Sequence, residues 1–221
     1  GQTDDINEGI SGIEKFYDEE LNNEEKIDSP LRLTLDSNLQ YLIRKELIRA
    51  QQNFQNTGSG AILMNIENGE VLSLVSLPDY DLNQRISIDD NIYTNKITLG
   101  VYELGSVFKT FTIAAGLENK VISPNTIFKN LENKLTCDKY TITEHDKLPK
   151  NLSVEQILIR SSNIGAVRIA QKVGIEKYKD FLKNLGLLDS MKFDLEEIGT
   201  PIPFRWGKCK LVTTSDRKSV V

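Results

Sequence analysis

Histidine and cysteine are scarce in this sequence, which contains one histidine, His145, and two cysteines, Cys137 and Cys209. A Ser-His-Asp triad would have to use His145, next to Asp146, and a metal site would be short of ligands. We therefore interpret His145 as a surface-loop residue, and we expect neither a metal nor a cofactor. Two cysteines do not form a disulfide framework, and we predict two unpaired thiols rather than a bridge.

Long apolar runs and blocks of basic residues are also missing. No run is long enough to span a bilayer, and no signal peptide is recognisable at the start. The formal net charge of −5, without a basic block, argues against nucleic acid as a partner. The 221 residues, 39% of them hydrophobic and 27% charged, suit a globular protein of one large or two small domains. Because the first residue is not methionine, we expect the sequence to begin inside a longer protein.

The first third of the chain contains a predicted helix and a predicted hairpin. Residues 1–30 are polar and acidic, and we interpret them as a linker with one short helix over 11–17. Alternating apolar and polar residues predict a strand over 31–35. Asp36 or Ser37 then caps a helix with an apolar face of Leu39, Leu42, Ile43, Leu47, Ala50 and Phe54.

Asn68-Gly69 separates two apolar runs, 61–66 and 71–75, which predicts a β-hairpin. Asp79 and Asp81 follow it. They form either a carboxylate pair or a solvated turn, and we favour the turn.

Helices are predicted to dominate the second half. Residues 107–117 are apolar all round, which indicates a buried central helix, whereas the polar stretch 119–149 indicates irregular structure. Further helices are predicted over 152–159, capped by Ser153, over the segment after Gly165, and over 175–185. From Asp189 onward the pattern indicates a loop, and residues 216–221 fit no element.

Ser106 and Lys109 stand at the head of the apolar helix. Positions i and i+3 share a helix face, so the hydroxyl and the amine are expected side by side. Gly105 suits a tight turn into the helix, whose positive dipole end would lie under the serine. Burial disfavours a charged lysine, so we expect a lowered pKa and a neutral amine able to act as a base.

Two further short motifs bear on this pair. Ser161-Ser162-Asn163 follows an apolar segment and caps a helix, and capping alone would explain it. A second S-x-x-K, at 215–218, lies in a polar tail without a predicted helix, and a second S-x-N, at 123–125, contains a proline that indicates a turn. We interpret both second copies as coincidences.

An S-x-x-K followed by a helix-mounted S-x-N is the ordered signature of penicillin-recognising serine acyl-transferases. From about Gly9 to Ser215 the chain resembles the transpeptidase domain of class B penicillin-binding proteins. The segments that carry the resemblance are 12–17, 33–36 with Leu39-Gln40, 95–109 and 161–165. Tyr102-Glu103 and the segment 186–189 look more like the division-specific branch than the elongation branch.

The resemblance implies an α+β, penicillin-binding/β-lactamase-like transpeptidase fold, in which an antiparallel sheet packs with helices beside an all-helical subdomain. The family's third motif, K-[ST]-G, does not occur in this sequence, where Lys109-Thr110 and Lys218-Ser219 both lack the glycine. We therefore expect a truncated or frame-disrupted product without the C-terminal strands. The expected domains are 1–30, a linker or remnant of an N-terminal pedestal domain, 31–215, a partial transpeptidase domain, and 216–221, a non-family tail.

The chemistry that the resemblance implies is cross-linking of peptidoglycan stem peptides by acyl transfer. Ser106 is the expected nucleophile, Lys109 the base and Ser161 a proton relay, while Asn163 holds Lys109 and the substrate amide. β-Lactams would acylate Ser106 as substrate mimics. The Ser106 N–H would supply half of the oxyanion hole, and the other half would lie after the missing motif, so the chain as given is expected to be impaired.

Two rival functions remain open: a serine β-lactamase or β-lactam sensor, and a non-catalytic scaffold of a cell-wall complex. The implied partners are stem peptides, β-lactam antibiotics and membrane proteins of the division complex. The implied location is the periplasmic face of the bacterial inner membrane, with an anchor in an N-terminal segment absent from this chain.

Overall fold

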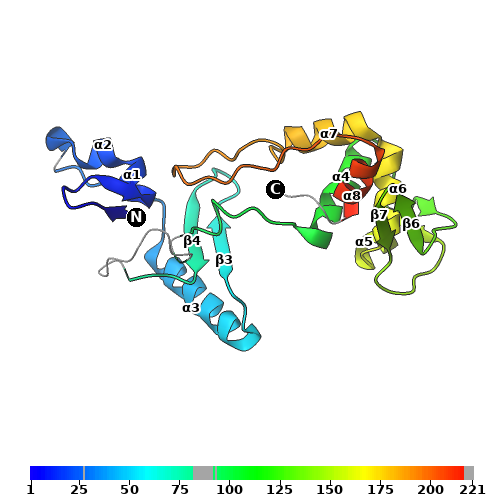
Figure 1. The fold of residues 1–221 in the computed structure, drawn as a ribbon, viewed down its shortest axis with the longest axis horizontal. Helices are drawn as coiled ribbons and strands as arrows, with labels where there is room; N and C mark the ends of the chain where they lie inside the picture. The colour runs from blue at the N-terminus through cyan, green and yellow to red at the C-terminus, as the bar shows by residue number, and fades with distance from the viewer. Residues whose placement is uncertain (27, 82–91, 93, 217–221) are drawn as a thin grey trace. The chain divides into compact units, whose positions relative to one another are not determined.

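The computed structural model describes residues 1–26, 28–81, 92 and 94–216, and it contains helices together with small antiparallel sheets. The chain divides into two compact units (Figure 1). The first comprises Gly1–Gly100 and Met191–Gly199, and the second comprises Val101–Ser190 and the chain from Thr200 onward. The predicted α+β class is confirmed.

The first unit begins with short elements. β1 (Gln2–Thr3) pairs antiparallel with β2 (Gly9–Ser11), and α1 (Gly12–Phe16), α2 (Asp18–Leu21) and the 3₁₀ helix η1 (Glu24–Lys26) follow. The short helix predicted over 11–17 is present as α1. The Gly12 N–H donates to Glu197 Oε1 over 2.7 Å, which links these elements to the segment 191–199 of the same unit.

The helix α3 (Ser37–Phe54) and a hairpin form the centre of the first unit. The predicted cap is confirmed, since the Asp36 carboxylate accepts from the N–H groups of Asn38 and Leu39 over 2.8 and 2.9 Å. The predicted hairpin is confirmed as β3 (Ser59–Met64) and β4 (Val71–Leu77), paired antiparallel on either side of Asn68-Gly69. The helix contacts both strands. On its predicted apolar face Leu42 and Phe54 are nevertheless exposed, at 53% and 79%.

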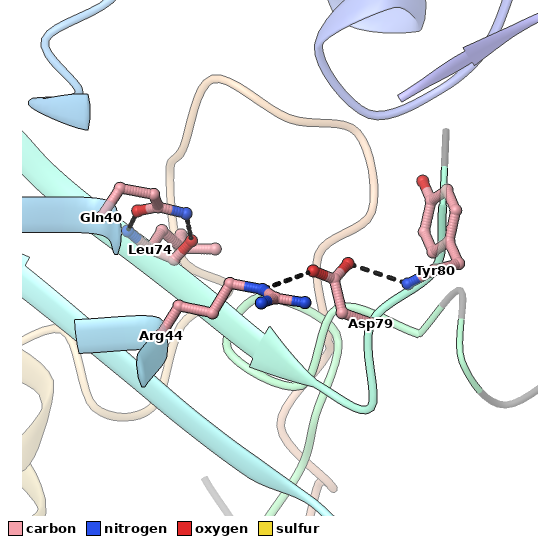
Figure 2. A network of polar contacts seen from close by, with 5 residues as sticks. All are labelled: Gln40, Arg44, Leu74, Asp79 and Tyr80. Atoms are coloured by element: carbon pink, nitrogen blue, oxygen red, sulfur yellow. Dashed lines mark hydrogen bonds and ion pairs between the residues drawn. The ribbon is translucent and has the colours of Figure 1, made fainter. Parts of the chain in front are cut away.

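Two polar side chains of α3 attach the helix to β4 and to the turn after it (Figure 2). The Gln40 amide donates to Leu74 O over 2.7 Å and accepts from Leu74 N over 2.9 Å, as a neighbouring strand would. Its oxygen also accepts from the Ser73 hydroxyl over 2.7 Å. Arg44 pairs with Asp79 over 3.0 Å, so this aspartate has a cationic partner.

The prediction of a strand over 31–35 is wrong. These residues form no strand: the Thr34 hydroxyl donates to Val71 O over 2.6 Å, and Asp36 N, just after the stretch, donates to Leu72 O over 2.9 Å. A strand needs a continuous ladder of backbone hydrogen bonds, and here side chains take the place of part of that ladder.

The second unit is built around α4 (Lys109–Glu118), which continues directly from the 3₁₀ helix η3 (Gly105–Phe108). In Figure 1, α4 lies among the other helices of its unit, and it contacts α5 (Val154–Ile159), α6 (Asn163–Val173), α7 (Ile175–Asn184) and α8 (Lys208–Asp216). The expected central helix is thus present. It is not buried all round, because Val107 and Leu117 are exposed, at 64% and 40%.

The helix predicted over 152–159 begins two residues later than expected, because a two-residue strand occupies its first two positions. Leu152–Ser153 forms β8, which pairs with β5 (Ile127–Phe128), and α5 begins at Val154. Ser153 caps α5 as predicted, in a capping box with Gln156. The predicted helix over 175–185 is confirmed as α7.

The irregular structure predicted for 119–149 is wrong in part, since β6 (Lys134–Cys137) and β7 (Tyr140–Thr143) form an antiparallel hairpin there. The prediction of two unpaired thiols is also wrong. Cys137, at the end of β6, forms a disulfide with Cys209 in α8, with a Cα–Cα distance of 5.4 Å. The partners are 72 residues apart, and the contact of α8 with β6 brings them together.

The loop predicted from Asp189 to the end is interrupted by α8, whose residues 211–215 are all buried. Three of those residues, Thr213, Thr214 and Ser215, carry hydroxyl groups, which obscured the helix in the sequence. The hydroxyls of Thr213 and Ser215 bond to carbonyl oxygens one turn earlier, Lys210 O and Val212 O, so they are paired inside the unit. Ser215 and Asp216, the first residue of the predicted tail, therefore do lie on a helix, whereas residues 217–221, including Lys218, fall outside the described residues.

Candidate active site

Ser106 lies in the 3₁₀ turn that enters α4. Gly105 has φ of +60°, a left-handed conformation that glycine adopts without a Cβ clash, which explains a glycine at this sharp entry. Ser106 is exposed, whereas Lys109, one turn further on, is buried with 1% of its surface accessible. The Lys109 Nζ lies 3.3 Å from the Ser106 Oγ, so the predicted side-by-side arrangement is present.

The lysine amine is surrounded by oxygen atoms from the α5–α6 junction. The Nζ lies 2.6 Å from Ser161 O and 3.0 Å from Ser161 Oγ, and it also hydrogen-bonds to Asn163 Oδ1. Thus one buried amine joins the hydroxyls of Ser106 and Ser161 and the amide of Asn163. The structure brings together all four residues that the sequence singled out.

Ser161 adopts an unusual backbone conformation at the end of α5. Its φ is +51°, its N–H donates to Leu158 O over 3.0 Å, and the N–H of Ser162 donates to Ile157 O over 2.9 Å. This pair of bonds is a Schellman motif with Ser161 at the position where glycine is most common. A serine there is strained, and the turn directs both its hydroxyl and its carbonyl oxygen to Lys109.

Asn163 is held on both sides of its side-chain amide. Its Nδ2 donates to Thr143 O over 2.6 Å, which orients Oδ1 towards Lys109. Its backbone N–H donates to Glu144 Oε2 over 2.8 Å, and Ser162 caps α6 by accepting from Gly165 N over 2.9 Å. Ser162 and Asn163 are buried, at 0% and 2%. Sequence reasoning missed Thr143 and Glu144, which lie in the stretch that it interpreted as irregular.

Hydrogen-bonding capacity limits what the amine can do. Ser161 O and Asn163 Oδ1 can only accept, so they take two N–H bonds from the lysine. A neutral amine has two such protons and one lone pair, and the lone pair is then left for a hydroxyl proton. The Ser106 and Ser161 hydroxyls both lie within hydrogen-bond reach of the amine. The arrangement suits the transfer of a proton from a serine hydroxyl to the amine.

Two other interpretations from the sequence concern the second unit. His145 and Asp146 are exposed, with side chains 83% and 80% accessible, and contact each other over 3.4 Å, so the surface-loop interpretation of His145 is confirmed. The turn predicted at 123–125 is confirmed as well.

Comparison with known proteins agrees with these features. Residues 59–215 match the family described as the penicillin binding protein transpeptidase domain. A probable peptidoglycan D,D-transpeptidase FtsI from Caulobacter vibrioides is 30% identical over 217 residues, covering 97% of this chain and 37% of that protein. Stage V sporulation protein D from Bacillus subtilis is 27% identical, covering 95% of this chain and 37% of that protein.

Solved structures show the same fold. The transpeptidase domain of Burkholderia pseudomallei penicillin-binding protein 3 has a TM-score of 0.73 at 26% identity, covering 87% of this chain and 54% of that one. A protein described as a putative peptidoglycan glycosyltransferase, from Atopobium parvulum, has a TM-score of 0.85 at 24% identity, covering 100% of this chain and 55% of that one. The chain spans about a third of the curated relatives' length and about half of these structures. Because the family matches well over half of the chain, this chain belongs to the penicillin-binding protein transpeptidase domain family.

Proposed function

We propose that this chain carries the nucleophile, base and relay residues of a peptidoglycan D,D-transpeptidase, which cross-links stem peptides and is acylated by β-lactams. The observation that supports this most directly is the buried Lys109 amine, which lies 3.3 Å from the Ser106 hydroxyl and is bound by Ser161 and Asn163. The Caulobacter relative, which matches almost the whole chain, carries the name probable peptidoglycan D,D-transpeptidase.

In the proposed reaction, Ser106 Oγ attacks the carbonyl carbon between two terminal D-alanines and gives its proton to Lys109 Nζ. The C–N bond of the substrate breaks, and the departing amine takes a proton from Lys109 through the Ser161 hydroxyl. The resulting ester is then attacked by an amine of a second stem peptide, which loses a proton to Lys109. The Ser106 oxygen regains a proton as the new peptide bond forms. Asn163 keeps Lys109 in place throughout and is proposed to contact the substrate amide.

The setting of the proposed enzyme is the periplasmic side of a bacterial inner membrane, in the division complex. The support is the FtsI name of the Caulobacter relative and the disulfide, which forms in oxidising compartments. Within the described residues, no helix is both long and apolar enough to cross a membrane. The proposed partners are stem peptides, β-lactams and membrane proteins of division, and the net charge of −5 argues against nucleic acid.

Penicillin labelling tests the assignment. In a chain extended through a K-[ST]-G motif, a fluorescent penicillin is expected to label Ser106, as located by mass spectrometry, and Ser106→Ala is expected to abolish labelling. An adduct on Ser161 or Ser215 would overturn the assignment. Rapid turnover of a chromogenic cephalosporin would instead indicate a β-lactamase, and an absence of any adduct would indicate a non-catalytic scaffold.

The role of Lys109 is tested by Lys109→Arg, which keeps the charge but supplies no neutral amine near neutral pH. Acylation is expected to fall by at least about 10²-fold, the lower end of what a positioned base contributes. Circular dichroism checks that the variant is folded. Acylation at the parent rate in a folded Lys109→Arg variant would show that Lys109 is not the base.

A further inference from the structure

Glu144 directly follows β7 and faces the start of α6. Its Oε1 accepts from the Ser162 hydroxyl over 2.7 Å and from Ile164 N over 3.0 Å, and its Oε2 accepts from Asn163 N over 2.8 Å. One carboxylate therefore binds three consecutive residues at the first turn of α6. Glu144 is itself held across the β6–β7 hairpin, because its N–H donates to Asn133 O over 3.3 Å.

The direction of each hydrogen bond at this turn is determined. The Ser162 hydroxyl accepts from Gly165 N over 2.9 Å and has one proton, which it donates to Glu144. Asn163 and Ile164 are buried, at 2% and 0%, and buried N–H groups need an acceptor. The first N–H groups of a helix have no partner within the helix, so Glu144 supplies the acceptor that these two lack.

The end of β7 thereby fixes Asn163 at two points. The Thr143 carbonyl holds the side-chain Nδ2 over 2.6 Å, and the Glu144 carboxylate holds the backbone N–H over 2.8 Å. Because the side-chain Nδ2 and the backbone N–H of Asn163 are both held, its Oδ1 is directed at the Lys109 amine, with which it forms a hydrogen bond. The chain of contacts from Glu144 to Asn163 to Lys109 ends at the Ser106 hydroxyl.

We propose that Glu144 is a positioning residue of the acyl-transfer site: by holding the first turn of α6 it sets the position of Asn163, and through Asn163 that of the Lys109 amine. The consequence for acylation rests on the proposed function. The positioning itself does not, since it concerns only contacts within this chain.

Glutamine is the informative substitution at this position. A carboxylate has two oxygens that both accept, whereas the amide of Glu144→Gln has one oxygen and one NH₂ group that only donates. If the NH₂ takes the place of Oε2, it faces the Asn163 N–H, and if it takes the place of Oε1, it faces the Ile164 N–H. In either orientation one buried N–H loses its acceptor, although the size of the side chain hardly changes.

The first experiment needs no activity and uses the chain of 221 residues. Hydrogen exchange followed by NMR is measured at the side-chain amide of Asn163 and at the backbone amides of Asn163 and Ile164. These protons are expected to be protected in the parent. In Glu144→Gln at least one of the two backbone amides is expected to exchange about tenfold faster, the effect of losing roughly one hydrogen bond. The ε-methylene resonance of Lys109 is expected to shift in the same variant.

Glu155→Gln is the matched control, because Glu155 is an exposed carboxylate in the first turn of α5 in the same unit. It is expected to leave all of these signals unchanged. Unaltered exchange at both the Asn163 and the Ile164 backbone amides in Glu144→Gln would overturn the proposal. Exchange of the Asn163 and Ile164 amides in the parent as fast as in exposed loops would also overturn it, and this measurement remains available if the variant does not fold.

The second experiment separates positioning from a general loss of structure. In a chain extended through a K-[ST]-G motif, Glu144→Gln is expected to lower the rate of acylation by penicillin about 10²-fold, the typical effect of a misplacement of about 1 Å. Reversible binding before acylation is expected to change by less than about threefold. Equal losses in both steps would contradict a positioning role. Absence of acylation in the extended parent would contradict the proposed function alone, since the exchange measurements still decide the position of Asn163.

Discussion

The strained backbone of Ser161 links the end of a helix to the arrangement of the candidate site. Ser161 occupies the left-handed position that ends α5, with φ of +51°, where glycine would fit without strain. Its carbonyl oxygen and its hydroxyl both contact the Lys109 amine. Glycine would keep the turn and the carbonyl contact but would remove the hydroxyl, so a strained serine at this position supports the proposed role of the hydroxyl.

Two substitutions at Ser161 separate its conformational role from its chemical one. Ser161→Gly relieves the strain and Ser161→Ala does not, so urea denaturation is expected to show the glycine variant about 1 kcal/mol more stable than the alanine variant. Both lack the hydroxyl, and in a chain extended through a K-[ST]-G motif both are expected to acylate more slowly than the parent by similar factors. An alanine variant as stable as the glycine variant would show that the left-handed turn is not maintained.

The sequence predicted those helices and strands whose determinants are local. The Asn68-Gly69 turn and the Asp36 and Ser153 caps act over a few residues, and the hairpin, α3 and α5 were found from them. The failures depend on contacts between distant segments. Residues 31–35 contact β4 without forming a strand. The helix α8 was not predicted, because its sequence is rich in hydroxyl residues, and the structure shows that these are buried and bond to carbonyl groups of their own helix.

The contact between α3 and β4 offers a test of how side chains replace strand pairing. Gln40→Leu keeps the size of the side chain but leaves Leu74 N, Leu74 O and the buried Ser73 hydroxyl without the Gln40 amide. Since an unpaired buried polar group costs about 1–3 kcal/mol, the free energy of unfolding of the first unit is expected to fall by about that amount. Chemical denaturation measures it.

Gln52→Leu is the matched control for Gln40→Leu, because Gln52 is exposed on the same helix. It is expected to change the free energy of unfolding by less than about 0.5 kcal/mol. Equal effects of the two substitutions would mean that Gln40 contributes no more than a surface residue.

The candidate site is assembled inside the second unit from segments far apart in the sequence. The S-x-x-K motif was recognisable because its spacing matches one helical turn, and the S-x-N motif because its residues are neighbours in the sequence at the start of α6. Glu144 lies 19 residues from Asn163 at the end of a short hairpin, and Cys137 lies 72 residues from Cys209. No local pattern links such partners, so only the packing of β6, β7, α6 and α8 reveals them.

The disulfide ties the β6–β7 hairpin, which ends at Thr143 just before Glu144, to α8. A crosslink that closes a loop of 72 residues is expected to stabilise the second unit by about 2–4 kcal/mol, mainly by restricting the unfolded chain.

Trp206, the single tryptophan, packs against Phe204 and Tyr178 in this unit, so its fluorescence reports on the unfolding of this unit. Guanidinium denaturation followed at Trp206 is expected to show a lower midpoint with a reductant than without it. The double variant Cys137→Ser/Cys209→Ser should match the reduced parent and should not respond to the reductant. Identical midpoints for the parent under both conditions, or two free thiols detected by mass spectrometry in the air-oxidised protein, would show that the bridge does not stabilise this unit.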